Sequence, residues 1–262
     1  MAETTYTLIT GASSGIGKEL AAQVAAHNKN IIIVAEQLQP LEKVARAVAK
    51  QYGVEAVAIA QDLSKPGAAQ ALFDEVKRRK LAVDTLINDA GIGAYGPFGE
   101  SDVQRIADML SVNAIALTQL TRLFLPELAK LPRAHIMNVA SVAGFLPGPY
   151  MSVYFATKHY VLALSEGLRA ELGNSSVRVT CLCPPPVQTP FVGASHIAKA
   201  NYMATTKVTP ARVAAYGYRA MLLGKAVAVY TLPYKILTAL LVRITPRFAL
   251  RRLLLRLNTQ GR

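Results

Sequence analysis

The chain has 262 residues, no tryptophan and only two cysteines; aromatic residues make up 7% of it and apolar residues 52%. This composition predicts a mostly aliphatic core. The cysteines, Cys181 and Cys183, stand two positions apart in a run typical of a strand. Side chains two apart on a strand point the same way but are poorly placed for a disulfide. We therefore expect two buried, reduced thiols and a reducing compartment.

Acidic residues are absent from the last third of the chain. All 16 Asp and Glu lie within residues 1–171, whereas residues 172–262 carry thirteen Lys and Arg. The net charge of +13 therefore belongs entirely to the C-terminal third. Aromatic residues do not interleave with these basic residues and no nucleic-acid motif is present, so we expect no nucleic-acid partner.

Signals for a metal site and for targeting are also missing. The four histidines are scattered, so we assign no metal ligands. No signal peptide precedes the first expected strand, which starts near residue 5. These observations favour a cytoplasmic protein.

Strand-like and helix-like segments alternate along the chain. Apolar runs such as 31–34 and 85–87 are typical of strands buried on both faces of a parallel sheet. The alternation predicts a single α/β domain of the Rossmann type, with a doubly wound parallel sheet of about seven strands. We expect strands at 5–10, 30–35, 55–60, 83–88, 133–139, 176–182 and 226–231, and helices at 15–28, 39–51, 66–80, 102–130 with a bend, 152–173 and 209–223.

A glycine-rich turn follows the first expected strand. Residues 10–17 read Thr-Gly-Ala-Ser-Ser-Gly-Ile-Gly and open a helical pattern. The glycines allow close approach of the backbone, and a helix N-terminus offers free N–H groups to a pyrophosphate. The sequence thus predicts a dinucleotide site formed by Gly11, Ser13, Ser14, Gly15, Ile16 and Gly17.

Tyr154 and Lys158 stand four residues apart on an expected helix, and Ser141 lies thirteen residues before the tyrosine. Positions i and i+4 share a helix face, so we expect the Lys158 ammonium to lie beside the phenol and to lower its pKa. Ser141 can donate a hydrogen bond to a reacting oxygen. With the dinucleotide turn, this set indicates proton transfer at an oxygen that gains or loses a hydride, and hence a nicotinamide-dependent oxidoreductase.

These motifs and their order resemble the short-chain dehydrogenase/reductase family along nearly the whole chain. The family's adenine contact appears as Asp62-Leu63 and its NNAG strand end as residues 88–91. Its structural and catalytic asparagine appears as Asn113, and its PGxxxT segment as residues 184–189. The resemblance implies cofactor contacts from Tyr154, Lys158, Asp62, Leu63, Asn88, Ala90, Gly91, Pro184, Val187 and Thr189. We also expect a homodimer or a homotetramer.

The resemblance further implies a role for each member of the catalytic set. Tyr154 gives the proton, Ser141 positions the reacting oxygen, and Lys158 holds the nicotinamide ribose hydroxyls. Asn113 supports a water that links Lys158 to solvent. Because the set is complete, an enzyme is favoured over a nucleotide-sensing protein that no longer turns over.

Two positions depart from the family pattern. Asp89 replaces the second Asn of NNAG and adds a possible charge near the edge of the sheet. Pro185 replaces the Gly of PGxxxT and lies within three consecutive prolines, which lack backbone donors. The backbone N–H of Val187 remains to hold the nicotinamide carboxamide.

Glu36 bears on the choice of cofactor. It follows Gly17 by nineteen residues, where an acid can bond the ribose 2′-hydroxyl and an Arg would accept a 2′-phosphate. By charge this favours NAD(H). By resemblance, Glu36 occupies the position where NADP-using relatives carry Arg, and Ala35 the position where NAD-using relatives carry Asp. We therefore prefer NAD(H), with NADP(H) bound by Lys or Arg from elsewhere as the alternative.

Apolar segments surround the expected cleft. Residues 190–208, which cover the substrate in the resembling family, are apolar and contain glycine. They favour an apolar or aromatic ketone or aldehyde, reversibly reduced to an alcohol, over a sugar. A 3-oxoacyl or hydroxysteroid reductase is the alternative activity, and packing of the lid is the alternative role for these side chains. The candidate substrate contacts are Tyr95, Phe145, Tyr150, Pro185 and Phe191.

Residues 232–262 are expected to form a basic, amphipathic helical extension to the domain of residues 1–231. Pro246 divides the extension into two helices, and neither reaches the roughly 20 apolar residues that span a bilayer. The second helix has an apolar face made of Leu250, Leu253, Leu254 and Leu257. We expect the extension to cover the active-site cleft or a subunit interface, or to lie peripherally on an anionic membrane surface.

Overall fold

A computed structural model of the chain describes residues 4–195 and 208–258. Seven parallel strands form one sheet in the order β3-β2-β1-β4-β5-β6-β7. The strands are β1 Thr5–Thr10, β2 Asn30–Ala35, β3 Ala56–Ala60, β4 Ala82–Asn88, β5 Ala134–Val139, β6 Val177–Cys183 and β7 Val227–Val229. The reversal of strand order beside β1 is the arrangement of a doubly wound sheet, as the alternating pattern predicts.

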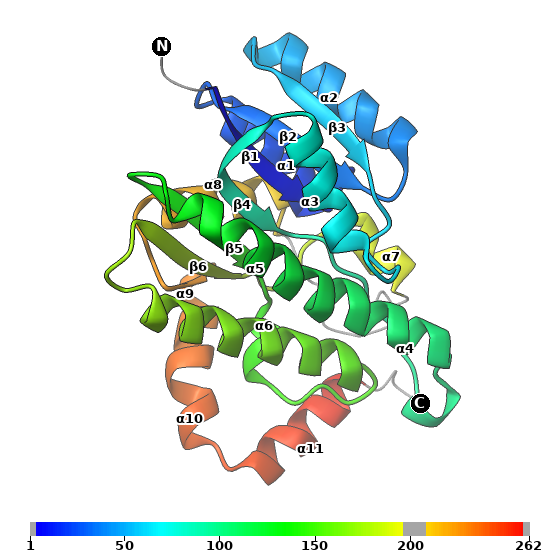
Figure 1. Cartoon of the computed structure of the whole chain (residues 1–262). Helices are drawn as coiled ribbons and strands as arrows, with labels where there is room; N and C mark the ends of the chain where they lie inside the picture. The colour runs from blue at the N-terminus through cyan, green and yellow to red at the C-terminus, as the bar shows by residue number, and fades with distance from the viewer. Residues whose placement is uncertain (1–3, 196–207, 259–262) are drawn as a thin grey trace.

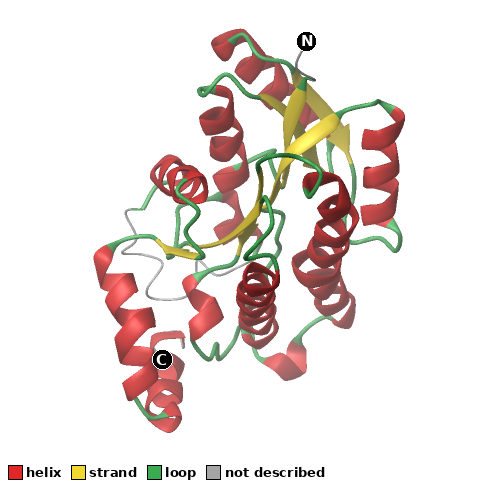
Figure 2. Cartoon of the chain, turned by 60° about the vertical axis from the view of Figure 1, so that its left-hand side comes forward, coloured by secondary structure: helices red, strands yellow, loops and turns green. Residues whose placement is uncertain are grey.

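Helices cover both faces of the sheet (Figure 2). The long ones within the sheet domain are α1 Gly15–Ala25, α2 Leu38–Tyr52, α3 Ala68–Arg78, α4 Val103–Leu110, α5 Leu117–Leu128, α6 Ser152–Glu171 and α8 Pro210–Leu222. Strand β2 shows why two layers form. Its side chains alternate, so Ile31 and Ile33 pack with α1, α2 and α8, while Ile32 and Val34 pack with α3 and α5.

The expected elements are confirmed with small shifts at their ends. The helix expected over 15–28 ends at Ala25, and Asn28 adopts a positive φ of 57° before β2 begins. The bend expected within 102–130 is the π-helical segment η2 Ser111–Ala116, which joins α4 to α5. The two cysteines are free and buried, with their sulfur atoms 3.8 Å apart.

Residues 232–258 form helices on the outside of α6 (Figure 1). The first stretch comprises α9 Leu232–Ile236, the π-helical η6 Leu237–Leu241 and α10 Val242–Ile244, and α11 Arg247–Asn258 follows beyond Pro246. Leu250 is buried with Met151 and Phe155 from the start of α6. Leu253 was expected on the same face but is 54% exposed, because only a narrow stripe of α11 meets the sheet domain. Within the described ranges, no helix combines the length and hydropathy needed to cross a bilayer.

The segment expected to cover the substrate is described only in part. It begins with the short helix α7 Pro190–Ala194. Residues 196–207, which include Tyr202 and Met203, lie outside the described residues.

Candidate active site

The carboxyl ends of four strands surround a cavity of about 420 Å³. The turn after β1, the end of β4, the turn after β5 and the prolines after β6 each contribute to its lining. Helix α6 and the C-terminal helices close the remaining sides. Parallel strands bring their carboxyl ends to one edge, so motifs far apart in the sequence meet here.

The glycine turn is held against the end of β4. Thr10 accepts hydrogen bonds from the backbone N–H groups of Asp89 and Ala90, each at 3.1 Å. Gly11 has a φ of +72°, and a Cβ on it would lie 2.8 Å from the Ala90 Cα. Only glycine fits this left-handed position so close to the neighbouring backbone.

The start of α1 fits the pyrophosphate of a dinucleotide. Ser14 precedes the helix and makes no side-chain hydrogen bond to it, and the first turn carries no acid. Asp89 accepts from the Gly17 N–H, so the N–H groups of Gly15 and Ile16 are the ones left to an external acceptor, and the helix dipole favours an anion there. Gly11, Ser14, Gly15 and Ile16 all line the cavity.

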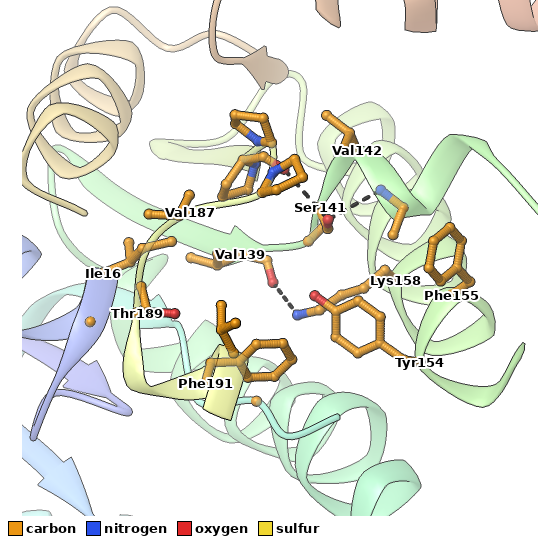
Figure 3. Close-up of a pocket in the computed structure, with 18 of the residues that line it drawn as sticks. Ile16, Val139, Ser141, Val142, Tyr154, Phe155, Lys158, Val187, Thr189 and Phe191 are labelled. Carbon is orange, nitrogen blue, oxygen red and sulfur yellow. Dashed lines mark hydrogen bonds between the residues drawn. The ribbon is translucent and has the colours of Figure 1, made fainter. Parts of the chain in front are cut away.

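Tyr154 and Lys158 project from the first turns of α6 into the cavity (Figure 3). The Lys158 ammonium is buried, donates a hydrogen bond to the Val139 carbonyl at 2.8 Å, and lies 5.7 Å from the centre of the Tyr154 ring. Burial lowers the pKa of Lys158, while the carboxylate of Asp89 opposes that shift.

The expected lowering of the tyrosine pKa is wrong for this structure. Burial raises the pKa of Tyr154 to about 12, although hydrogen bonding with the Ser141 side chain acts in the opposite direction. The physical reason is that desolvation of the phenolate outweighs the favourable contacts, and the ammonium of Lys158 is directed at Val139. At neutral pH the phenol is therefore protonated.

Ser141 lies between β5 and the short helix η3 Val142–Phe145. Its Oγ accepts a hydrogen bond from the Ala143 N–H at 3.1 Å and donates a long one, 3.4 Å, to the Pro184 carbonyl. The Pro184 carbonyl also accepts from the Val142 N–H at 2.9 Å. These contacts fix the serine beside the prolines and leave its proton in a weak bond.

Asn113 does not line the cavity but supports it from behind. Its side-chain amide exchanges two hydrogen bonds of 2.9 Å with the backbone of Ile92, and it also donates to Thr157 on α6 at 3.1 Å. It occupies the π-helical turn η2, a feature frequent at functional sites. Asn113 thus joins three segments: the loop after β4, the α4–α5 helix and α6.

Asp89 is the most unusual group in the cavity wall. It is half-buried, it accepts a hydrogen bond from the Gly17 N–H, and a Cβ on Gly17 would lie 2.6 Å from its Oδ2. Burial raises the pKa of Asp89 to about 7, while Lys158 and the Gly17 N–H act to lower it. A carboxyl group with a pKa raised to about 7 therefore lies against the glycine turn.

Of the predicted site residues, 13 line the cavity and 11 do not. Those that line it are Gly11, Ser14, Gly15, Ile16, Gly91, Ser141, Tyr154, Lys158, Pro184, Pro185, Val187, Thr189 and Phe191. The other predicted residues belong to the described part of the chain but lie outside this lining: Ser13, Gly17, Glu36, Asp62, Leu63, Asn88, Ala90, Asn113, Tyr95, Phe145 and Tyr150.

Local contacts explain several of these displacements. Tyr95 and Tyr150 stack on each other, with ring centres 5.8 Å apart. Phe145 packs into the apolar clusters behind η3. The Asp62 carboxylate accepts hydrogen bonds from the N–H and hydroxyl of Ser64, at 2.9 and 2.7 Å.

Several apolar residues of the wall were not predicted as substrate contacts. They are Phe155, Tyr234, Leu237, Leu254 and Leu257. The periodicity of α11 signalled an apolar face that includes Leu254 and Leu257. It did not reveal which surface that face meets, since the partner lies a hundred residues earlier, on α6.

Comparisons with known proteins identify relatives of the chain. The family model described as short chain dehydrogenase matches residues 5–199. A very-long-chain 3-oxoacyl-CoA reductase of Anas platyrhynchos is 30% identical over 215 residues, which cover 80% of this chain and 67% of that protein. A short-chain dehydrogenase from Sphingobium yanoikuyae, solved in complex with NADPH, is 28% identical with a TM-score of 0.82 and covers 98% of each chain. One from Burkholderia phymatum, solved in complex with NAD, is 26% identical with a TM-score of 0.82 and covers 99% of this chain and 97% of that chain.

Proposed function

This chain belongs to the short-chain dehydrogenase/reductase family of nicotinamide-dependent oxidoreductases, and we propose that it reversibly reduces the carbonyl group of a largely apolar ketone or aldehyde. The observation that carries the proposal is the Tyr154 phenol, which stands in a cavity of about 420 Å³ between the pyrophosphate turn and an apolar wall. A proton donor, a dinucleotide cradle and an apolar substrate space share one site.

The proposed chemistry assigns one task to each polar side chain. The bound nicotinamide cofactor supplies or accepts the hydride. Tyr154 gives its phenolic proton to the carbonyl oxygen, and with a pKa raised to about 12 it holds that proton throughout the neutral range. Ser141 keeps its Oγ fixed by the Ala143 N–H and turns its weakly bound proton to the same oxygen. Lys158, held by the Val139 carbonyl, has further donors for the ribose hydroxyls.

The protonated phenol favours the reductive direction. Oxidation of an alcohol requires a phenolate at Tyr154 to accept the proton, and a pKa of about 12 makes that form rare at neutral pH. Reduction begins with the form of the side chain that already predominates.

NAD(H) is the proposed cofactor, with NADP(H) as the alternative. Glu36 is exposed just beyond the carboxyl end of β2, where the adenine ribose lies in dinucleotide-binding folds. A carboxylate can accept a hydrogen bond from a 2′-hydroxyl, whereas it would repel a 2′-phosphate. The two solved relatives hold different cofactors, so the choice rests on this side chain.

The proposed substrate has an apolar body next to its carbonyl group. Leu146 and Phe155 form one part of the cavity wall, and Leu237, Leu254 and Leu257 of the C-terminal helices form another. An acyl chain or a fused ring system would bury its surface there. The similarity to a very-long-chain 3-oxoacyl-CoA reductase supports the same class of substrate.

A panel of aliphatic, aromatic and fused-ring carbonyls, followed by NADH and NADPH absorbance, tests the proposal. Tyr154→Phe should reduce kcat on the best substrate by about 10²–10⁴-fold while the cofactor still binds. Tyr160→Phe is the matched control, because Tyr160 lies on the same helix but is exposed and its hydroxyl contacts Thr118. If Tyr154→Phe kept more than about a tenth of the wild-type kcat, the assigned proton donor would be wrong.

A further inference from the structure

The C-terminal helices carry a row of large apolar side chains that face solvent. We call it the C-terminal stripe; its members are Leu232, Ile236, Leu240, Ile244 and Phe248, and each is between 47% and 67% exposed. The five positions recur every fourth residue through α9, η6 and α10 and into α11. Both views of the molecule show these helices standing away from the sheet (Figures 1 and 2). The stripe therefore follows the outer side of the extension.

The π-helical segment η6 helps to keep a spacing of four on one side. Four residues overshoot one α-helical turn of about 3.6 residues, so such a row drifts around an ordinary helix. A π-helical turn, closed by i→i+5 hydrogen bonds, contains more than four residues. A row with a spacing of four therefore falls short of a full turn there and drifts in the opposite direction. The two deviations offset each other between Leu232 and Ile244.

Helix α11 has a second apolar face that points away from the cavity. At about 100° per residue, Phe248 and Leu255 fall on one side, opposite the buried Leu250. Arg251 and Arg252 flank them, and both are exposed. The outward face of α11 is thus apolar along its middle and basic on both borders, as in helices that lie flat in a lipid interface.

The charge of this region selects among the possible partners. All four arginines of α11 are exposed, and no Asp or Glu occurs anywhere in residues 172–262. A second copy of the chain docked stripe to stripe would bring arginines against arginines, because a twofold interface pairs each patch with itself. An acidic lipid surface is complementary in both respects, since it accepts the apolar side chains and attracts the arginines.

We propose that the C-terminal stripe and the outward face of α11 bind the surface of an anionic lipid bilayer. Leu237, Leu254 and Leu257 of the same helices line the cavity from the inside. A single layer of helices thus separates the cavity from the lipid. Resting on the proposed function, this placement would let a lipophilic carbonyl compound pass from the bilayer to Tyr154 without crossing water.

Co-sedimentation of the full chain with vesicles tests the proposal without reference to catalysis. We expect the wild type to sediment with vesicles of phosphatidylcholine and phosphatidylglycerol at low salt, and to be released at high salt. Arg251→Gln with Arg252→Gln should weaken binding roughly 30-fold, since each arginine near such a surface increases the affinity by about fivefold. Phe248→Ser with Leu255→Ser should weaken it by about tenfold or more, since two large apolar side chains no longer enter the interface.

Matched controls carry the same chemical changes elsewhere on the surface. Arg46→Gln with Arg122→Gln removes two exposed arginines from α2 and α5, and Leu222→Ser with Leu223→Ser removes exposed leucines at the end of α8. Both controls should bind vesicles like the wild type. Circular dichroism and reduction of a water-soluble carbonyl compound confirm that each variant is folded.

Three results would overturn the proposal. The first is a wild type that never sediments with anionic vesicles at low salt. The second is equal binding to vesicles of pure phosphatidylcholine, which would remove the role of the arginines. The third is a wild-type dimer that the stripe variants convert to monomers without any vesicle binding, which would make the stripe a subunit interface. None of these results bears on the carbonyl reduction assay, so failure here and failure of the proposed function are distinguishable.

Discussion

Replacing Asp89 by Asn should stabilise the protein, and the gain should depend on pH. Asn has nearly the same shape, and its Oδ1 can still accept the hydrogen bond from the Gly17 N–H. It cannot ionise, so it avoids the cost of a charge in this half-buried position. The two proteins share every other titratable group, and the difference between their free energies of unfolding therefore reports on Asp89.

The sign and size follow from the shift in pKa. In the folded protein burial raises the pKa of Asp89 from 3.8 to about 7. Between these two values the unfolded chain has lost the proton while the folded chain keeps it, so the wild type loses stability as the pH rises. The loss amounts to at most about 1.4 kcal/mol per pH unit. Water in the cavity that Asp89 lines reduces this limit, and we expect about 2 kcal/mol in total between pH 5 and pH 8.

The assay is urea unfolding of both proteins at steps of pH from about 5 to about 9. The free energy of unfolding of the Asn variant should increasingly exceed that of the wild type up to neutral pH, and the difference should then stay constant. Binding of ADP-ribose gives a second readout, because an ionised carboxylate beside Gly17 opposes the pyrophosphate. The affinity of the wild type for ADP-ribose should fall as the pH rises through neutral, and the affinity of the variant should not. A difference in stability that is the same at pH 5 and pH 8 would refute the reasoning, since Asp89 would then be ionised throughout.

Three further predictions concern the catalytic site. Because burial raises the pKa of Tyr154 to about 12, kcat/KM for alcohol oxidation should rise by up to about tenfold per pH unit from pH 6 to pH 9. Over the same range kcat/KM for carbonyl reduction should stay level, and two pH profiles of the same slope would contradict this prediction. Glu36→Arg should shift kcat/KM from NADH toward NADPH, whereas Glu171→Arg at the far end of α6 should not, and a wild type that prefers NADPH would disprove the role of Glu36. Leu254→Trp should raise KM for bulky carbonyls but not for the smallest one, and Leu253→Trp, on the exposed side of α11, should change neither.

Features that depend on local pattern could be predicted from the sequence. Strand β2 lies where the apolar run Ile31–Val34 places it, and the turn with Gly11 follows β1 as its glycines require. The carboxyl ends of the strands then meet at one edge, which brings Gly11, Ser141 and Pro184 to one cavity without further information. Short-range pattern and a topological rule are enough for the frame of the site.

Features that depend on desolvation and long-range packing could not be predicted. The spacing of Tyr154 and Lys158 correctly places both on one helix face, but it does not reveal that burial outweighs the ammonium. Tyr95 stacks on Tyr150, and no local pattern indicates this contact between residues 55 positions apart. The apolar face of α11 was visible, but its contact with Phe155 required the folded chain.

The charge on Asp89 acts on the pKa of both Lys158 and Tyr154, and so bears on whether reduction or oxidation is favoured. The Asp89 carboxylate adds to the raised pKa of Tyr154 and opposes the lowering of the Lys158 pKa by burial, so it favours the protonated phenol and the ammonium together. An asparagine, which the resembling family carries at this position, would make the same hydrogen bond without either effect. A charge at Asp89 therefore favours the protonated phenol that the proposed reduction requires, and it does so more strongly as the pH rises and the carboxyl group ionises. The Asn variant should accordingly oxidise alcohols at a lower pH than the wild type does.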